Sequence, residues 1–190
     1  MNPKLFQDSQ LYDFLERVDE DLAEKTRQEG CCRDGVLHRA DYPRKPRAGP
    51  ARRSWERRRS FCCNREGCRR RHTPPSVRFL GRKVYVGVVV VLVGAMMHGI
   101  SRRRIVALRG ELGVDERTLW RWQAWWRERF VQTAFWKTAR ALVMPPVDAR
   151  RFPGCLVDRF AGWKVEGLVR LMRFLSPITA SSTGEATMAF

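Results

Sequence analysis

The clustered cysteines are the residues of this sequence best suited to do chemistry. Cys62, Cys63 and Cys68 lie in the stretch FCCNREGCRRR, and Cys31 and Cys32 form a second group upstream. Zinc ribbons draw four Cys or His ligands from two short segments of this kind. The metal supplies the stability that so small a core lacks. The sequence therefore predicts one zinc-ribbon-like site within residues 30–83.

The first of these two segments lacks the usual spacing of zinc ligands. Cys31 and Cys32 are adjacent, and we expect only Cys32 to bind because neighbouring cysteines rarely bind one zinc ion together. His38 is the preferred fourth ligand, and Asp34 or water are alternatives. The predicted zinc ligands are Cys32, His38, Cys63 and Cys68. Cys62 as the ligand of the second segment, and a loop of free thiols, stay open as alternatives.

The start of the chain indicates the compartment. Met1-Asn2-Pro3-Lys4 is not followed by the apolar stretch of a signal peptide. We therefore expect a cytoplasmic protein whose thiols are reduced. In such a compartment, clustered cysteines bind metals more often than they form disulfides.

One apolar run, VYVGVVVVLVGAMM at residues 84–97, raises the question of a membrane segment. It has about 14 residues, whereas spanning a bilayer takes roughly 20. Its length and context favour a buried helix, although VYVGVVVV alone is compatible with a strand. A membrane-embedded segment is kept as the less favoured alternative.

The charge of the chain is strongly positive. The sequence has 37 lysines and arginines against 20 aspartates and glutamates, a formal net charge of +17. Residues 1–30 are the exception, with four basic and eight acidic residues. A cationic body repels itself, and its commonest partner is a polyphosphate. DNA is therefore the predicted partner. Anionic lipid is the alternative, a homodimer stays open, and the sequence indicates no small-molecule substrate.

Residues 105–124 match the twenty-residue pattern of a helix-turn-helix, with a glycine at the ninth place and apolar residues facing the helix junction. With Gly113 at the ninth place, the five junction positions are Leu108, Leu112, Val114, Leu119 and Trp122. Asp115 is expected to cap the second helix. Arg109 departs from the pattern, because the fifth place usually holds a small residue. An ordinary helical hairpin is the alternative.

This alignment predicts which side chains contact DNA. Arg117 and Arg121 are four residues apart on one helix, so both can enter a major groove and bind guanine. Arginines in RRSWERRR and after Cys68 are expected to contact phosphates. The predicted DNA-binding residues are Arg117, Thr118, Trp120, Arg121, Arg69, Arg70, Arg71, Arg57 and Arg58. The other aromatic residues of this region are expected mostly in the core, with a platform for stacking single strands as the alternative.

Four stretches of the chain are similar to one known group of proteins. LHRADYPRKPR, FCCNREGCRRR, TPPSVRFLGRKVY and RFLSPIT resemble bacterial proteins associated with insertion sequences. The resemblance covers most of residues 30–178 and implies a zinc ribbon followed by a helix-turn-helix. Members usually read C-x-x-C-x-G where this chain reads CCRDG, so Arg33 or Asp34 replaces a cysteine. A degenerate transposase-like relic without activity is therefore an alternative.

The chain is not expected to catalyse a reaction. Cut-and-paste transposases need three carboxylates that bind two metal ions, within an α/β domain of well over about a hundred residues. The carboxylates after the predicted helix-turn-helix are Glu128, Asp148, Asp158, Glu166 and Glu185. No strand-rich segment surrounds them. We therefore expect a non-catalytic DNA-binding protein of insertion-sequence type; a membrane-associated helical interaction protein is the remaining alternative.

The expected fold is mainly α, with a small N-terminal zinc-ribbon-like β module before a helix-turn-helix bundle. Residues 1–29 are expected to hold an acidic amphipathic helix capped by Ser9, with Leu11, Phe14, Leu15, Val18 and Leu22 on its apolar face. The expected parts are this helix (1–29), a basic ribbon-like module (30–83), the bundle (84–143), a C-terminal amphipathic helix (144–178) and a disordered tail (179–190). The last helix is expected over residues 155–175, ending before Ser176-Pro177.

Overall fold

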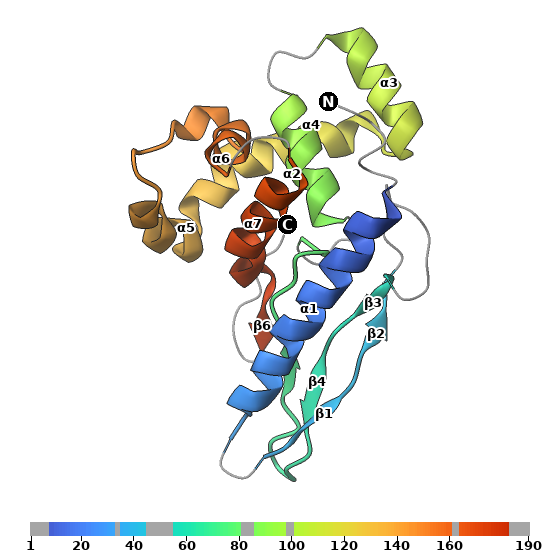
Figure 1. The fold of residues 1–190 in the computed structure, drawn as a ribbon, viewed down its shortest axis with the longest axis vertical. Helices are drawn as coiled ribbons and strands as arrows, with labels where there is room; N and C mark the ends of the chain where they lie inside the picture. The colour runs from blue at the N-terminus through green and yellow to red at the C-terminus, as the bar shows by residue number, and fades with distance from the viewer. Residues whose placement is uncertain are drawn as a thin grey trace.

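The computed structural model describes residues 8–32, 35–44, 55–80, 86–97, 101–160 and 164–182. A small antiparallel sheet lies at one end of the molecule with a long helix along it, and a group of helices forms the other end (Figure 1). The described residues contain seven α-helices. The predicted mainly α fold with a small antiparallel sheet is confirmed.

Helix α1 (Ser9–Glu29) is amphipathic, as predicted. Its N-cap is Asp8 rather than Ser9, because the Asp8 carboxylate accepts hydrogen bonds from the backbone N–H groups of Gln10 and Leu11. Phe14 of the predicted apolar face is 39% exposed. The buried residues of α1 are Leu11, Tyr12, Leu15, Val18, Asp19 and Ala23.

Four very short strands form the main sheet. Their order is β1 (Leu37–Arg39), β4 (Phe61–Cys63), β5 (Arg71–Thr73) and β6 (Ser181–Ser182), and all neighbours are antiparallel. Strands β2 (Tyr42–Pro43) and β3 (Arg57–Arg58) pair separately. In the main sheet, Leu37 lies opposite Cys63 and His38 opposite Cys62. Because successive residues of a strand point to opposite faces, Cys62 and Cys63 are directed to different sides of the sheet.

The C-terminal segment differs from the disordered tail expected over residues 179–190. Residues 181–182 form β6, which pairs with β5 through backbone hydrogen bonds. Thr179 precedes this strand, and its hydroxyl accepts a hydrogen bond of 2.7 Å from the backbone N–H of Ser76. This pairing depends on a strand far away in the sequence, which local composition does not reveal. Residues 183–190 lie outside the described part of the chain.

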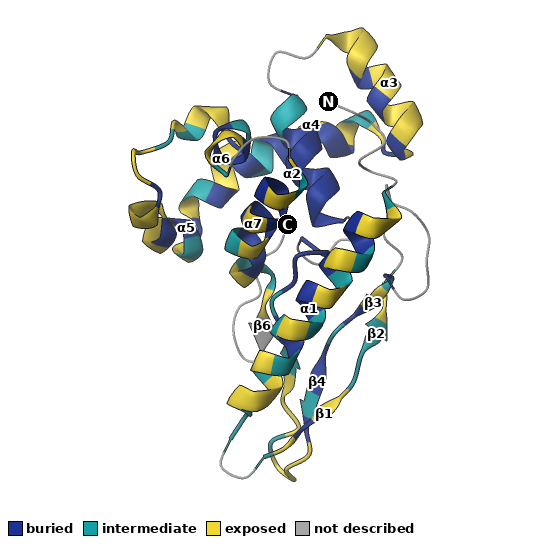
Figure 2. Ribbon diagram, in the orientation of Figure 1, coloured by how far each residue is buried: buried dark blue, intermediate teal, exposed yellow. Residues whose placement is uncertain are grey.

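The apolar run of residues 84–97 forms helix α2 (Gly87–Met96) at the centre of the helical end. All residues from 87 to 94 are buried (Figure 2). Helices α4, α6 and α7 contact it, so burial on all sides outweighs the low helix propensity of valine. In the described part of the chain, no helix is both long enough and apolar enough to cross a membrane.

The described residues contain five more helices after α2. They are α3 (Arg102–Leu112), α4 (Glu116–Ala124), α5 (Ala134–Ala139), α6 (Gly154–Arg159) and α7 (Val165–Leu175). Helix α4 continues into a π-helical stretch, η2 (Trp125–Arg129), and a 3-10 turn, η3 (Phe130–Gln132). Further 3-10 turns are η4 (Arg140–Leu142), η5 (Ala149–Arg151) and η6 (Ser176–Thr179).

The single helix expected over residues 155–175 is instead two helices, α6 and α7. Three consecutive residues of α6, Cys155, Leu156 and Val157, are buried, so this short helix packs on more than one side. Only α7 is amphipathic in the expected way, and it ends at Leu175, as predicted from Ser176-Pro177. Residues 161–163, between the two helices, are outside the described part.

Aromatic rings fill the core beside α2, as predicted. Phe130 lies 4.9 Å from Trp126, 5.3 Å from Trp136 and 5.4 Å from Phe152, measured between ring centroids. These four side chains are buried, whereas Trp120 is 45% exposed. Most aromatic residues of this region therefore stabilise the core, and Trp120 remains accessible to a partner.

Candidate functional site

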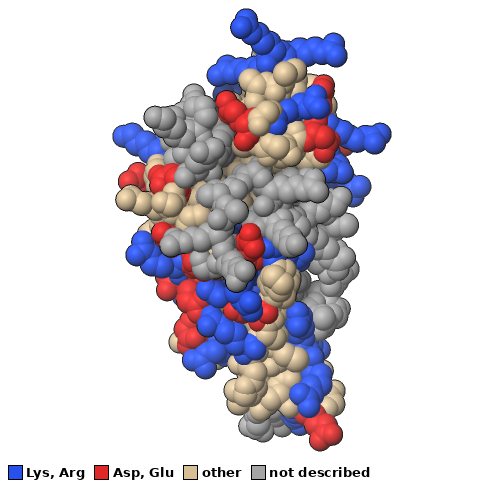
Figure 3. Space-filling model, turned by 90° about the vertical axis from the view of Figure 1, so that its right-hand side faces the viewer, with Lys and Arg blue, Asp and Glu red and all other residues tan. Residues whose placement is uncertain are grey.

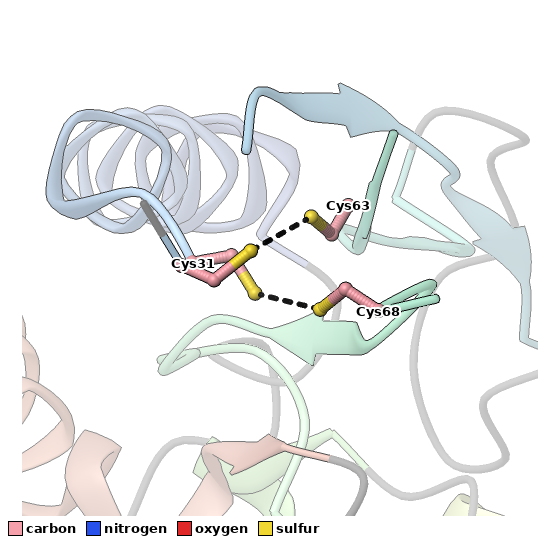
Figure 4. A group of neighbouring side chains, drawn as sticks. Cys31, Cys63 and Cys68 are labelled. Carbon is pink, nitrogen blue, oxygen red and sulfur yellow. Dashed lines mark hydrogen bonds between the residues drawn. The ribbon is translucent and has the colours of Figure 1, made fainter. Parts of the chain in front are cut away.

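Four cysteines come together at the end of the sheet. The sulfur atoms of Cys31, Cys32, Cys63 and Cys68 all lie within 4.8 Å of one another. Cys31 Sγ is 3.6 Å from Cys68 Sγ, and Cys32 Sγ is 3.7 Å from Cys63 Sγ. Figure 4 shows the labelled thiols of this group directed toward one shared space.

These distances fit a bound metal ion better than disulfides. A disulfide has an S–S length of about 2.05 Å, much shorter than either sulfur–sulfur distance. A tetrahedron with zinc–sulfur bonds of about 2.3 Å has edges of roughly 3.8 Å, close to both. The four cysteines can therefore hold a metal ion, and their geometry is consistent with zinc.

Two local structures position the cysteines. Helix α1 ends at Glu29, and Gly30 then takes a positive φ of 71°, which turns the chain toward Cys31 and Cys32. Strand β4 ends at Cys63, and a turn leads back to Cys68. In this turn, the backbone N–H of Cys68 donates to the carbonyl of Arg65 at 3.1 Å.

Gly35 lies against the sulfur atoms. A Cβ atom at this position would lie 2.7 Å from Cys63 Sγ and 2.8 Å from Cys32 Sγ. Any side chain would therefore push two thiols apart, so the site requires glycine here. No pattern in the sequence marks this residue, because its role depends on sulfur positions that only the folded chain defines.

The thiols of Cys31, Cys32 and Cys68 differ in how strongly they hold their protons. Burial raises the pKa of Cys31 to about 12, with further contributions from the thiols of Cys68 and Cys63. Burial likewise raises the pKa of Cys32. A hydrogen bond from the backbone N–H of Arg70, together with one from Cys31, lowers the pKa of Cys68 to about 7. A dication must displace the remaining protons, so binding releases protons.

The predicted ligand set differs from this group at one position. Cys32, Cys63 and Cys68 belong to it, but Cys31 takes the place predicted for His38. His38 is exposed and lies opposite Cys62. Because side chains alternate along a strand, both are directed away from the face of the sheet on which Cys63 lies. Asp34 lies outside the described residues.

The adjacent cysteines were expected to exclude each other. They do not, because they follow a helix end instead of lying within a strand, and each approaches a different partner. Cys31 meets Cys68 and Cys32 meets Cys63. Both segments contain a pair of adjacent cysteines. The sequence pattern therefore did not indicate which thiols would come together.

A second candidate surface is formed by α3 and α4. Gly113 joins the helices in the left-handed conformation, with φ 58° and ψ 29°. The Asp115 carboxylate caps α4 by accepting from the Thr118 N–H at 2.8 Å, and hydrogen bonds from Thr118 lower the pKa of Asp115. The five predicted junction residues, Leu108, Leu112, Val114, Leu119 and Trp122, are all buried.

The residues predicted to enter a DNA groove do not all face outward. Arg117, Trp120 and Arg121 are exposed on α4. Thr118 is only 3% exposed, which corrects the prediction that it contacts DNA. Its hydroxyl donates to Asp115 at 2.8 Å and accepts from Arg121 at 3.0 Å. Thr118 thus completes the cap of α4 and is not available to a partner.

The arginines predicted to contact phosphates also divide into two groups. Arg69, Arg70 and Arg71 are exposed at the end of the cysteine turn, and Arg57 is exposed on β3. Arg58 is 4% exposed, and burial lowers its pKa. It donates to the carbonyls of Pro74 at 2.6 Å and Thr179 at 3.1 Å. The prediction for Arg58 is therefore wrong, because its guanidinium holds the C-terminal segment against the sheet.

The arginines beside α1 form ion pairs with carboxylates. Arg59 lies 3.4 Å from Glu16, 2.7 Å from Glu20 and 3.0 Å from Asp41. Arg39 also pairs with Glu20. In the view of Figure 3, acidic and basic side chains lie next to one another below the grey residues. The acidic helix therefore neutralises much of the positive charge of the sheet.

A buried ion pair joins α1 to the segment before α2. The carboxylate of Asp19 lies 2.8 Å from Arg78 Nε, and both side chains are 1% exposed. Asp19 also accepts from the Ser76 hydroxyl and the Val77 N–H, each at 2.6 Å. Arg78 donates in addition to the carbonyls of Trp55 and Arg57. This network was not predicted, since neither residue is distinguished in the sequence from its exposed neighbours.

Comparison with known proteins yields no relative: no family model matches the chain, and no curated protein or solved structure is significantly similar to it. The function must therefore be argued from the two candidate surfaces themselves. One is the group of four cysteines with its flanking arginines. The other is the exposed side of α4.

Proposed function

We propose that the protein is a non-catalytic DNA-binding protein of insertion-sequence type. In this proposal, α3, Gly113 and α4 form a helix-turn-helix, and the four cysteines bind zinc in a ribbon. The observation that carries the proposal is the arrangement of α4. Its inner side is buried at the junction with α3, while Arg117, Trp120 and Arg121 are exposed on its outer side.

Helix α4 would read bases in the major groove. Arg117 and Arg121 are one turn apart on its exposed side, and arginine binds the O6 and N7 acceptors of guanine. Among the described residues, Arg117 has no ion-pair partner, so its guanidinium is free to bind DNA. The Arg121 guanidinium donates a hydrogen bond to the Thr118 hydroxyl at 3.0 Å, which restricts its conformations. Trp120 is exposed beside Arg117 on α4 and would contact the edges of neighbouring bases.

The cysteine turn would contact the DNA backbone. Arg69 and Arg70 follow Cys68 directly, and Arg69 has a φ of 44°, in the region that residues with side chains rarely adopt. The surrounding turn holds this conformation through backbone hydrogen bonds from Arg69 to Arg65 and from Cys63 to Arg70. Fixed arginines bind phosphates with a smaller loss of conformational entropy. Such contacts add affinity without sequence preference.

Zinc would have a structural role in this proposal. Its ligands would be Cys31, Cys32, Cys63 and Cys68. Four thiolates complete a tetrahedron and leave no open position for a substrate, which is typical of structural zinc. A metal ion held in this way would join the end of α1 to the turn that carries Arg69 and Arg70.

The proposal gives the carboxylates of the chain no catalytic role. Within the described residues, the four cysteines are the only group of three or more potential metal ligands. This group does not include the carboxylates of Glu128, Asp148, Asp158 and Glu166. Glu185 lies outside the described part. Two-metal transposition chemistry needs such an assembly.

The test is binding to DNA by matched arginine variants. A preferred duplex is first selected from random DNA with the zinc-loaded full chain. Arg117→Ala should then lower binding to that duplex by roughly 1–3 kcal/mol and change binding to random duplexes little. Arg69→Ala should weaken binding to both and lower the salt slope by about one.

Arg170→Ala is the matched control, because it removes one exposed arginine from α7, away from both surfaces. It should leave the preference for the selected duplex unchanged. If Arg117→Ala weakens binding to both kinds of DNA equally, the groove-reading role of α4 is wrong. Binding to anionic liposomes in place of DNA at the same salt would instead support the membrane-associated alternative.

A further inference from the structure

The two candidate surfaces lie at opposite ends of the molecule. We call Arg69, Arg70 and Arg71 the metal-end surface, and the exposed residues Arg102, Arg103, Arg104, Arg117 and Arg121 the α3–α4 surface. In Figure 1 the longest axis of the molecule is vertical, with α3 at the top and the end of α1 that precedes Cys31 toward the bottom. Helix α1 runs between these two ends.

The length of α1 sets a scale for the separation. The helix has 21 residues, and an α-helix rises about 1.5 Å per residue, so it is roughly 30 Å long. The metal-end surface directly follows Cys68, whose sulfur lies 3.6 Å from that of Cys31, just after the C-terminal end of α1. Helix α3 lies beyond the N-terminal end of α1 in the long direction (Figure 1). The two surfaces are therefore about 30 Å apart or somewhat more. One turn of duplex DNA is about 34–36 Å long.

Both ends present positive charge on one face. Figure 3 shows that face, turned about the vertical axis of Figure 1, so heights along the long axis are the same in the two views. Basic side chains project at its top, at the height of α3, and lie again near its bottom. Among the described residues, Arg69, Arg70 and Arg102 have no ion-pair partner, whereas Arg39 and Arg59 in the middle are paired with carboxylates of α1 and Asp41.

From this spacing we infer that one chain binds a single DNA duplex along its long axis, at two points about one helical turn apart. Helix α4 occupies one major groove. The metal-end surface contacts the DNA backbone about one turn away from that groove, in one direction along the duplex only. The inference rests on the proposed function and adds the substrate: duplex DNA with at least about one extra turn on one defined side of the site read by α4.

The charge pattern favours binding of one long duplex at the two ends over binding of DNA by the whole face. If the whole face bound DNA, the middle arginines would need to exchange their carboxylates for phosphates. Arg59 is held by three carboxylates, which makes that exchange unfavourable. Because Arg39 and Arg59 are held by carboxylates, contacts at the two ends require a duplex long enough to reach both, and a shorter duplex loses one set of contacts completely.

The experiment varies the flanks of the selected duplex. The zinc-loaded full chain is titrated with duplexes that carry the site alone or the site plus about one turn of DNA on the left, the right or both sides. Affinity should rise about tenfold or more for one flank and not for the other. The logarithmic salt slope should steepen for that duplex by about 0.9 for each phosphate gained.

The variant Arg69→Ala/Arg70→Ala identifies the source of this gain. It should bind the duplex with the effective flank and the duplex without it nearly alike. Arg170→Ala/Arg173→Ala removes the same charge from exposed positions of α7 and should keep the full gain. Metal content and circular dichroism of each variant verify that the fold is intact.

Three results would overturn the inference. Equal gains from the left and right flanks would indicate a diffuse coat, and an unchanged gain in Arg69→Ala/Arg70→Ala would exclude the metal-end surface. Two short duplexes bound to one chain without any gain from length would show bridging of separate duplexes. A chain that binds no duplex of any length would contradict the proposed function itself, which the other results leave intact.

Discussion

Cys31 is the residue whose replacement tests the metal centre most directly. Its sulfur lies 3.6 Å from that of Cys68, within the group of four thiols. Cys31→Ser should therefore weaken zinc binding by roughly tenfold or more, measured by competition with a chromogenic chelator under reducing conditions. Cys62→Ser is the matched control. The Cys62 sulfur is not part of the group and lies against the backbone carbonyls of Cys63 and Arg69. This variant should therefore bind zinc as the wild type does.

His38→Ala provides the opposite test. His38 is exposed and lies outside the group of four cysteines. Its replacement should leave the metal content at one ion per chain. A loss of zinc in His38→Ala together with normal binding by Cys31→Ser would contradict the arrangement of ligands described above.

Asp115 gives the fold a defined response to acid. Hydrogen bonds from the hydroxyl and N–H of Thr118 lower its pKa. A carboxylate whose pKa is lower in the folded state stabilises that state above its unfolded value of about 3.9. The stabilisation is lost as the pH falls through the lower folded pKa. Urea unfolding of the wild type between about pH 5 and pH 2 should therefore show this loss.

Two substitutions separate capping from titration at this position. Asp115→Asn keeps a side-chain oxygen that can accept from the first turn of α4 but has no charge to titrate. It should remove the contribution of this residue to the acid response while keeping most of the helix stability. Asp115→Ala should lose both. Equal acid responses in all three proteins would show that the cap does not link pH to stability.

At the scale of elements, the buried pair of Asp19 and Arg78 holds α1 onto the chain before α2. Asp19→Ala would leave the Arg78 guanidinium buried without its carboxylate. The free energy of unfolding should fall by about 3–5 kcal/mol, measured by denaturant titration. Glu20→Ala removes a carboxylate one residue away, from partly exposed pairs with Arg39 and Arg59, and should cost only about 0–1 kcal/mol. Similar costs for the two would indicate that burial does not distinguish these pairs.

At the scale of the whole molecule, the two ends differ in what stabilises them. The core at the metal end consists of Ala23, Leu37, Phe61 and Cys63. The large core around α2 contains most of the other buried side chains. A core of four side chains cannot offset the entropy of ordering its strands. We therefore expect the metal end to depend on a bound metal, and the helical end not to.

Metal removal should separate these two ends. After chelation in reducing buffer, hydrogen exchange should accelerate at the amides of β1, β4 and β5, because loss of the metal frees the cysteine turn. Amides of α2 and α7 should remain protected, since their core has no metal ligand. Readdition of zinc should restore protection at the strands. Simultaneous loss of protection in α2 would show that the chain unfolds as one unit instead.

Several features of this protein could be predicted from short stretches of its sequence. The 3.6-residue spacing of Leu11, Leu15 and Val18 predicts α1, and Ser176-Pro177 predicts the end of α7. Gly113 and Asp115 mark the end of α3 and the start of α4. Such signals depend on contacts within about one helical turn, so neighbouring residues contain them.

Only the tertiary structure decided which residues meet at the functional surfaces. The choice of Cys31 over His38 depends on the register of β1 against β4 and on the direction in which α1 ends. The burial of Arg58 depends on the return of the C-terminal segment to the sheet. The sequence by itself determined the chemistry available, six thiols and many guanidinium groups. Packing between segments distant in the chain selected among them, because burial and strand register are properties of two segments together and of neither alone.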